Sequence, residues 1–313
     1  MSYQESKGHV LQIQSQVVHG YVGNSASTLP FNLLGFQTSS LNICQYSNHV
    51  GYKQWTGVNL KPTDMNLILD GLKLNNFQSN WTHILSGYMS TKELLLELVK
   101  FIEDVRNNSK RSMNSSNEIV IKNPSIQYVC DPVLGDNGHL YVPEELVEIY
   151  RDKLIPLADL VTPNAFEAEQ LTGREIRTED DALRAVDWFH SKGVGTVVLT
   201  SAQCDPGDES KLTMIASRRS SDKDDAQRYK IEFAKKEGRY TGTGDVTAAL
   251  ITSWLTLTNG DLQKSAEMAL GGIQSVLDYT KPGHDLNLIP CREFILKPKH
   301  IFQAVKIEKE DCK

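Results

Sequence analysis

Short β-prone runs alternate with helical segments along most of the chain, and this alternation restricts the possible folds more than any other feature. The β-prone runs are expected at residues 9–15, 84–88, 126–133, 160–164 and 196–201. Between them, residues 92–105 and 180–192 carry apolar side chains at helical spacing. Strands that alternate with helices predict βαβ units, in which helices cover a mostly parallel sheet.

The organisation of the chain favours a single domain over residues 1–313, because no repeat and no Pro/Gly-rich linker divides it. Two β-prone runs between residues 212 and 234 flank a polar stretch, which predicts a hairpin with a surface loop at 218–228. The Asn- and Ser-rich residues 107–118 predict a second surface loop. The ends, 1–8 and 306–313, are expected to be flexible.

Charge and composition exclude several classes of function. The chain has 39 acidic and 33 basic side chains, a net charge of −6, which argues against a broad nucleic-acid or membrane surface. The N-terminus lacks the pattern of a secretory signal, and the most apolar helical candidate, 246–257, is too short to span a bilayer. Five cysteines without a CxxC pair indicate reduced thiols. We therefore expect a soluble, cytosolic protein.

The sharpest local motif is Gly242-Thr243-Gly244-Asp245, followed directly by an apolar run. Glycines let the backbone approach a ligand closely, and the first amides of a helix are unpaired, so this motif suits phosphoryl oxygens. Asp245 then lies beside the transferring phosphate. Asp is also common in the first turn of helices that do no chemistry, so both interpretations stay open. GTGDVT lacks the third glycine of a dinucleotide fingerprint, and GxxxxGK[ST] is absent from the sequence.

Polar side chains follow the predicted strands where each one ends. Asp131 and Asp136 come after the third predicted strand, where ligands bind in open α/β sheets, and both suit hard cations. They are alternatively turn-forming residues around Pro132 and Gly135.

The remaining predicted strands also end in polar groups. Thr162, Asn164 and Glu167 follow the fourth, although Asn164 and Glu167 equally match a helix capping box. Thr200 and Ser201 end the fifth strand, and Ser15 ends the first. The convergence of these groups at one sheet edge predicts a site for a nucleotide and a cosubstrate.

Together these segments resemble the ribokinase-like superfamily and, within it, the eukaryotic pyridoxal kinases. The GTGD motif is shared across the superfamily, whereas the family resemblance lies in residues 13–24, 45–52, 128–136 and 162–173 (IQSQVVHGYVGN, QYSNHVGY, YVCDPVLGD and TPNAFEAEQLTG). It extends from about His9 to about Tyr279. It implies a three-layer αβα sandwich and transfer of the ATP γ-phosphate to the 5′-hydroxyl of pyridoxal, pyridoxine or pyridoxamine, with pyridoxal 5′-phosphate formed from pyridoxal in vitamin B6 salvage. It also implies Mg²⁺ (or Zn²⁺ or Mn²⁺), K⁺ or Na⁺, and a cytosolic homodimer.

The resemblance also assigns roles to individual residues. Asp245 is the base, and Gly242, Thr243 and Gly244 form the anion hole. Asp136 and Glu167 organise magnesium and phosphate-bound water, while Asp131, Thr162 and Thr200 arrange the monovalent cation. The nucleotide side adds Tyr141, Asn164, Thr200, Ser201 and Thr243. The vitamin pocket comprises Ser15, Val22, Tyr46, His49, Val50 and Tyr88, although aromatics such as Tyr88 serve equally in ordinary cores.

Three departures from the family pattern bear on specificity. Val50 stands where Thr is common, which removes a hydroxyl worth about 0.5–1.5 kcal/mol in one hydrogen bond. Tyr46 stands where Phe is common, and the loop between Asp136 and Tyr141 is short. Competing hypotheses are a kinase for hydroxymethylpyrimidine or a sugar, a vitamin-binding protein on an inactive kinase scaffold, and a nicotinamide-dependent oxidoreductase. The intact GTGD motif with Asp131 and Asp136 argues against the inactive scaffold.

Overall fold

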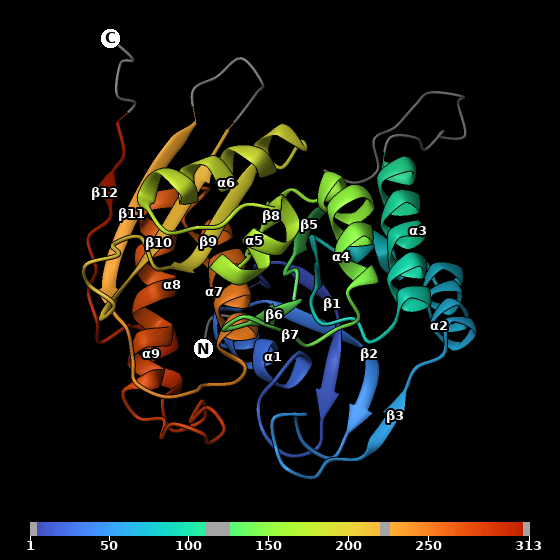
Figure 1. Cartoon of the computed structure of the whole chain (residues 1–313). Helices are drawn as coiled ribbons and strands as arrows, with labels where there is room; N and C mark the ends of the chain where they lie inside the picture. The colour runs from blue at the N-terminus through green and yellow to red at the C-terminus, as the bar shows by residue number, and fades with distance from the viewer. Residues whose placement is uncertain (1–4, 110–125, 220–225, 309–313) are drawn as a thin grey trace.

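The computed structural model describes residues 5–109, 126–219 and 226–308. Its centre is a ten-stranded sheet with the order β12-β11-β10-β9-β8-β5-β4-β1-β2-β3 (Figure 1). The strands are β1 (His9–Val17), β2 (Gln37–Tyr46), β3 (Gly57–Asn59), β4 (His83–Ser86), β5 (Gln127–Cys130), β8 (Leu160–Val161), β9 (Thr196–Ala202), β10 (Lys211–Arg218), β11 (Gln227–Ala234) and β12 (Val305–Lys306). The six strands from β9 to β2 are parallel, and those at both edges are antiparallel.

Helices cover both faces of this sheet and complete three layers (Figure 1). One layer contains α2 (Pro62–Leu74), α3 (Lys92–Ser109), α4 (Glu145–Ile149), α5 (Ala165–Thr172) and α6 (Glu179–Ser191). The other contains α1 (Asn24–Leu33), α7 (Thr243–Leu257), α8 (Leu262–Leu277) and α9 (Arg292–Leu296). The short turns η1 (Phe77–Asn80), η2 (Tyr150–Leu154) and η3 (Ile155–Leu157) connect elements. The predicted αβα architecture is confirmed.

The central strands are apolar on both sides because each one separates two cores. In β5, Tyr128 packs in the core beneath α3 to α6, whereas its neighbour Val129 packs in the core beneath α7 and α8. Val10 and Leu11 of β1 divide in the same way. Burial on both faces explains why these runs read as continuous apolar segments and not as alternating ones.

Several predicted boundaries differ from the structure. β1 continues to Val17, so Ser15 lies inside the strand, next to an irregularity in its pairing with β2. β9 continues one residue beyond Ser201. The strands predicted at 126–133 and 160–164 are shorter, at Gln127–Cys130 and Leu160–Val161, so Asp131 and Thr162 come directly after them.

The predicted loops fall partly outside the described residues. Helix α3 continues to Ser109, so residues 107–109 are helical, while 110–118 lie outside the described part. The hairpin at 212–234 is confirmed by the antiparallel pairing of β10 with β11, which places 218, 227 and 228 in strands and leaves 220–225 outside the description. Residues 1–4 and 309–313 are outside it too. Within the described ranges, no helix is both long and apolar enough to cross a bilayer.

The order of the strands in the sheet determines where a ligand-binding crevice can form. From β1 the chain passes to β2 on one side, and later to β4, β5, β8 and β9 on the other. Such a reversal opens a crevice outside the carboxyl ends of the strands, where ligands bind in open α/β sheets. A small hairpin, β6 (Gly135–Asp136) with β7 (His139–Leu140), lies after β5 beside this edge.

Candidate functional site

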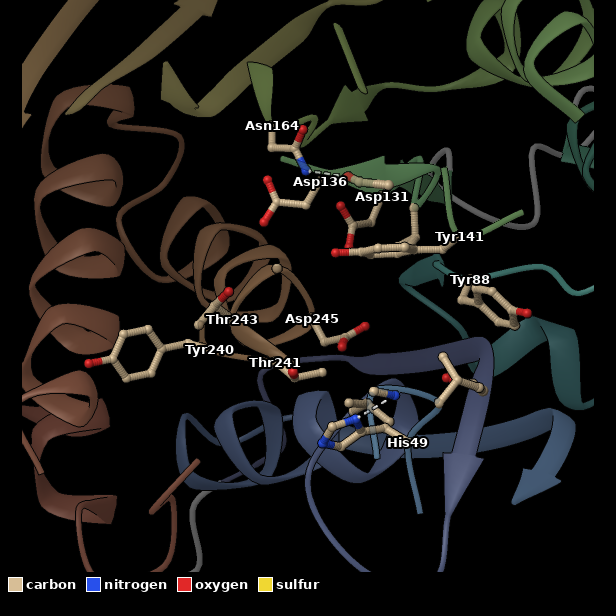
Figure 2. A pocket seen from close by; sticks show the side chains of 18 of the residues that line it. His49, Tyr88, Asp131, Asp136, Tyr141, Asn164, Tyr240, Thr241, Thr243 and Asp245 are labelled. Atoms are coloured by element: carbon tan, nitrogen blue, oxygen red, sulfur yellow. Dashed lines mark hydrogen bonds between the residues drawn. The ribbon is translucent and has the colours of Figure 1, made fainter. Parts of the chain in front are cut away.

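A cavity of about 430 Å³ lies at this carboxyl edge, between the strand ends and the first turn of α7 (Figure 2). Every site residue predicted from the sequence lines it except Ser201. Ser201 lines a second cavity of about 490 Å³, which shares Asp136, Asn164, Thr200 and Thr243 with the first. The two cavities therefore adjoin, and the structure gathers all of the predicted residues around them.

The start of α7 depends on a glycine. Gly242 precedes the helix with φ +87°, and a Cβ there would lie 2.1 Å from the carbonyl oxygen of Tyr21. Only glycine adopts that conformation without strain and permits such an approach. Thr243, Gly244 and Asp245 then form the first helical turn, and their amides face the cavity end of the helix. In Figure 2, Asp245 and Thr243 lie across the cavity from Asp131 and Asp136.

Two carboxyl groups that line this cavity, those of Asp131 and Asp245, both have raised pKa values. The Thr162 hydroxyl donates to Oδ1 of Asp131 at 2.8 Å, whereas Oδ2 is buried without a hydrogen-bond partner in the described structure. Burial, followed by the negative charge of Asp245, raises the pKa of Asp131 to about 8. Burial also raises the pKa of Asp245 to about 6, although an amide hydrogen bond from Gly23 opposes the shift. Both shifts favour the protonated carboxyl, and the shift is larger for Asp131 than for Asp245.

Asn164 and Glu167 form the capping box that the sequence left as an alternative. The Asn164 side chain accepts from the Glu167 amide at 2.9 Å, and Glu167 Oε2 accepts from the Asn164 amide at 2.9 Å. Glu167 Oε1 accepts from the Leu134 amide at 3.1 Å, so this carboxyl also ties the segment after β5 to α5. Burial, and secondly the charge of Asp131, raise the pKa of Glu167. Capping and a place in the cavity are therefore compatible.

Asp136 is exposed at the end of β6, where its oxygens accept from the backbone amide and side-chain nitrogen of Asn137, both at 2.8 Å. Its turn-forming role is thus present, and the residue also lines the cavity. Among the residues that the structure describes, no three His, Cys, Asp or Glu side chains converge on a metal position. A divalent cation here needs ligands from water or phosphate in addition to protein, as Mg²⁺ usually does.

The opposite end of the cavity is apolar and aromatic. Val22, Tyr46, Val50 and Tyr88 line it together with His49. The Tyr46 ring packs 4.9 Å from Trp55, and its hydroxyl donates to Asn59 Oδ1 at 2.5 Å. That hydroxyl therefore already has a partner on β3. Val50 lines the cavity and is 49% exposed, so it lies at the rim.

Sequence reasoning missed the segment before the glycine motif. Arg239, Tyr240 and Thr241 all line the cavity, and the Arg239 guanidinium lies 6.0 Å from the centre of the Tyr141 ring. Tyr141 therefore reaches the cavity despite its short loop. In the second cavity, Phe233 and Leu277 add apolar surface. In the sequence, the residues of both groups look like ordinary core positions of strands and helices. The one signal among them is Arg239, a basic residue close to the glycine motif.

The chain was compared with known proteins. A family model described as phosphomethylpyrimidine kinase matches residues 108–287. Pyridoxal kinase of Sus scrofa is 38% identical, with 88% of this chain and 84% of the relative covered. Pyridoxal kinase of Bos taurus is also 38% identical, with 96% and 99% covered. The chain belongs to the pyridoxal kinase family.

Solved pyridoxal kinases share the fold over nearly the full length. The enzyme from Leishmania donovani, in complex with ADP and pyridoxine, superimposes with a TM-score of 0.86 at 32% identity, covering 97% of this chain and 100% of the other. Pyridoxal kinase from Trypanosoma brucei gives a TM-score of 0.83 at 30% identity, covering 96% and 100%. The resemblance drawn from four motifs is confirmed.

Proposed function

We propose that this protein transfers the γ-phosphate of ATP to the 5′-hydroxyl of pyridoxal and of the related vitamers pyridoxine and pyridoxamine, in vitamin B6 salvage. The observation that carries the proposal is the position of Asp245. Its carboxyl lies in one cavity with both the unpaired amides of α7 and an apolar ring-sized pocket. Related structures hold ADP with pyridoxine, and AMP-PNP with PL, in enzymes of the same family.

Asp245 acts as the base in this proposal. With a pKa of about 6 it is ionised at neutral pH, yet it remains basic enough to accept the proton of a hydroxyl as the bond to phosphorus forms. Gly242, Thr243 and Gly244 direct backbone amides at the phosphoryl oxygens, where they stabilise the negative charge that phosphoryl transfer distributes. The vitamin ring lies between Val22, Tyr46, His49, Val50 and Tyr88, with Ser15 beside it.

The nucleotide is proposed to extend from this point into the second cavity. Asn164, Thr200 and Thr243 line both cavities and so mark the passage for the phosphates. Ser201, Phe233 and Leu277 lie farther along, where a base and ribose need apolar surface and a few polar contacts. Tyr141 and Arg239 stand at the junction.

Cations complete the proposed site. Asp136 and, through water, Glu167 would hold Mg²⁺ (or Zn²⁺ or Mn²⁺), because both Glu167 oxygens already accept backbone amides. Asp131, Thr162 and Thr200 would hold K⁺ or Na⁺, and the unpartnered Oδ2 of Asp131 offers a free ligand atom for it. Bound there, the cations would supply neutralising charge for the phosphates.

The broader organisation is also a proposal. One domain is supported by a single sheet that contains both β1 and β12. A homodimer is supported by β3, an exposed edge strand, and by the exposed Leu67 and Leu74 of the neighbouring α2. A cytosolic location is supported by the free thiols of Cys44, Cys130, Cys204 and Cys291.

A coupled assay of ADP formation tests the proposed function. We expect turnover with pyridoxal, pyridoxine and pyridoxamine, and formation of pyridoxal 5′-phosphate from pyridoxal by absorbance. Hydroxymethylpyrimidine is the necessary comparison, because the family model that matches residues 108–287 is named for a pyrimidine kinase. Faster turnover of the pyrimidine than of all three vitamers would overturn the assignment, and tight pyridoxal binding without ATP-dependent product would indicate a binding protein.

A further inference from the structure

Asp285 lies outside the lining of the cavity, in the segment between α8 and α9, yet it contacts two loops that do line it. The Tyr52 hydroxyl donates to its Oδ2 at 2.7 Å. His49 Nε2 lies 3.7 Å from Oδ1, and His19 Nε2 lies 3.5 Å from Oδ2. The Asp285 side chain is only 17% exposed and that of His49 12%, whereas Tyr52 and His19 reach the solvent.

The loop after β1 is built to admit this carboxylate. Gly20 has φ +96°, and a Cβ at that position would lie 2.1 Å from Oδ1 of Asp285. A residue with a side chain would displace either the loop or the carboxylate. Asp285 therefore packs against the backbone at Gly20 and, at the same time, bonds to Tyr52 of residues 47–56, which we call the substrate loop.

The orientation of His49 follows from this arrangement. The Gly51 amide donates to Nδ1 of His49 at 3.1 Å, so the neutral ring carries its proton on Nε2, which faces Asp285. The ring also packs against Tyr52 at 4.6 Å. Burial lowers the pKa of His49, the charge of Asp285 opposes that shift, and Arg239 across the cavity adds to it. His49 is therefore neutral at pH 7.

Oδ1 of Asp285 has no hydrogen-bond partner within the described chain. Its distance of 3.7 Å from His49 Nε2 is slightly too long for a hydrogen bond. A small movement of the His49 ring toward Asp285 would form that bond, and contacts in sites without ligand often tighten when the ligand binds. His49, Val50 and Gly51 line the vitamin end of the cavity, so such a movement would shift that wall.

We propose that Asp285 is a positioning residue for the vitamin: it anchors the substrate loop through Tyr52, orients His49, and thereby sets the affinity for the B6 vitamer rather than the rate of phosphoryl transfer. The inference rests on the proposed function. Asp285 lies 233 positions from Tyr52 in the sequence, and the cavity lining alone does not reveal its role.

Kinetics of Asp285→Asn and Asp285→Ala test this role. We expect KM for pyridoxal to rise about tenfold, the size of losing one hydrogen bond to a charged partner, while kcat and KM for ATP change less than about twofold. Tyr52→Phe is expected to raise KM for pyridoxal several-fold. The double variant of Tyr52→Phe with Asp285→Ala should be no worse than Asp285→Ala alone, because both changes remove the same contact.

Asp261→Asn is the matched control. Asp261 caps the N-terminus of α8 by accepting from the Lys264 amide at 2.9 Å, and it does not line either cavity. Asn caps helices as well as Asp does. This variant removes the same charge without touching the substrate loop, so we expect all kinetic constants to stay within about twofold of those of the unmodified protein.

Hydrogen exchange of the substrate loop gives a second measurement that needs no turnover. In the protein without ligands, the amides of 47–56 should exchange faster in Asp285→Ala than in the unmodified protein. This result tests the anchor even if no vitamer is phosphorylated, in which case the proposed function fails on its own. An unchanged KM for pyridoxal with unchanged exchange would refute the role of Asp285. A fall in kcat, together with a rise in KM for both pyridoxal and ATP and a lowered Tm, would also refute it, since these changes would indicate general destabilisation.

Discussion

Replacing Asp245 with Asn should abolish most of the activity and, at the same time, stabilise the folded protein. The first effect follows from loss of the base, and we expect kcat to fall roughly 10²- to 10⁴-fold. The second follows from burial. The ionised carboxyl of Asp245 lies in surroundings that raise its pKa from 3.8 to about 6, so the folded state holds that charge at a cost.

The magnitude follows from proton linkage. Each unit of difference between the pKa of the folded state and that of the unfolded state corresponds to about 1.4 kcal/mol. The raised pKa of Asp245 therefore lowers the free energy of unfolding by about 3 kcal/mol at pH 7. The amide of Asn also loses water when it is buried, which leaves an expected gain of about 1–2 kcal/mol. For a chain of this size the corresponding rise in Tm is about 1.5–3 °C.

The pH dependence fixes the sign. A carboxyl with a raised folded pKa destabilises the protein only when it is ionised, so the advantage of Asp245→Asn is nearly complete at about pH 7, shrinks as the pH falls through the folded pKa of about 6, and disappears only below about pH 3, where both states of the unmodified protein bind the proton. Thermal denaturation of both proteins between pH 4 and pH 8, without ligands, measures this difference. A coupled ADP assay measures kcat on the same preparations.

The opposite interpretation gives the opposite sign. If Asp245 served only as a first-turn carboxylate, Asn would remove a favourable interaction with the helix dipole of about 0.3–1 kcal/mol and leave kcat nearly unchanged. A lowered Tm at pH 7.5 together with full activity would therefore refute the reasoning about both the burial of this group and its role.

Three further outcomes are expected. Gly242→Ala should lower the free energy of unfolding by about 2 kcal/mol or more and raise KM for ATP, because Gly242 has a positive φ and a Cβ there would lie 2.1 Å from the carbonyl oxygen of Tyr21. Denaturation and nucleotide titration measure these two effects, and an unchanged Tm would contradict the prediction. Val50→Thr should alter KM for pyridoxal by less than about tenfold, with kcat unchanged, when the three vitamers are compared. The K⁺ concentration for half-maximal activity should fall at least about tenfold between pH 6.5 and pH 8.5 at constant ionic strength. The reason is that protons compete with K⁺ for Asp131, whose pKa is raised to about 8. A K⁺ requirement that does not change with pH would show that Asp131 is not part of the cation site.

The sequence predicted the central strands well because their composition reflects burial on both faces. All five predicted runs are strands, and all five are mutually parallel. β2 was missed because Gln37–Tyr46 is rich in polar residues and half exposed. α1 was missed because it contains Pro30, which normally marks a helix boundary, and polar residues at buried positions.

The site residues that could be predicted are those whose side-chain chemistry and local sequence context both indicate a ligand site. Asp131, Asp136 and Asp245 adjoin strand or helix ends, and such ends point to a ligand site in any parallel sheet. Asp285 had no comparable signal. Its partner Tyr52 is 233 residues away, and the contact exists only because the segment after α8 returns to the loop after β2. Periodicity and motifs report neighbours along the chain, so they do not reveal a contact of this kind.

The surroundings of the buried carboxyls favour their protonated forms at the place where the proposed function needs cations. Asp131 and Glu167 are buried, and burial opposes ionisation of both; the charge of Asp245 further raises the pKa of Asp131, and the charge of Asp131 further raises that of Glu167. The folded chain tolerates these carboxyls because Thr162 and the amides of Asn164 and Leu134 satisfy most of their oxygens. The exception is Oδ2 of Asp131. An atom left without a partner inside a fold destabilises it, so its retention beside Asp245 is most simply explained by a ligand that the complex supplies.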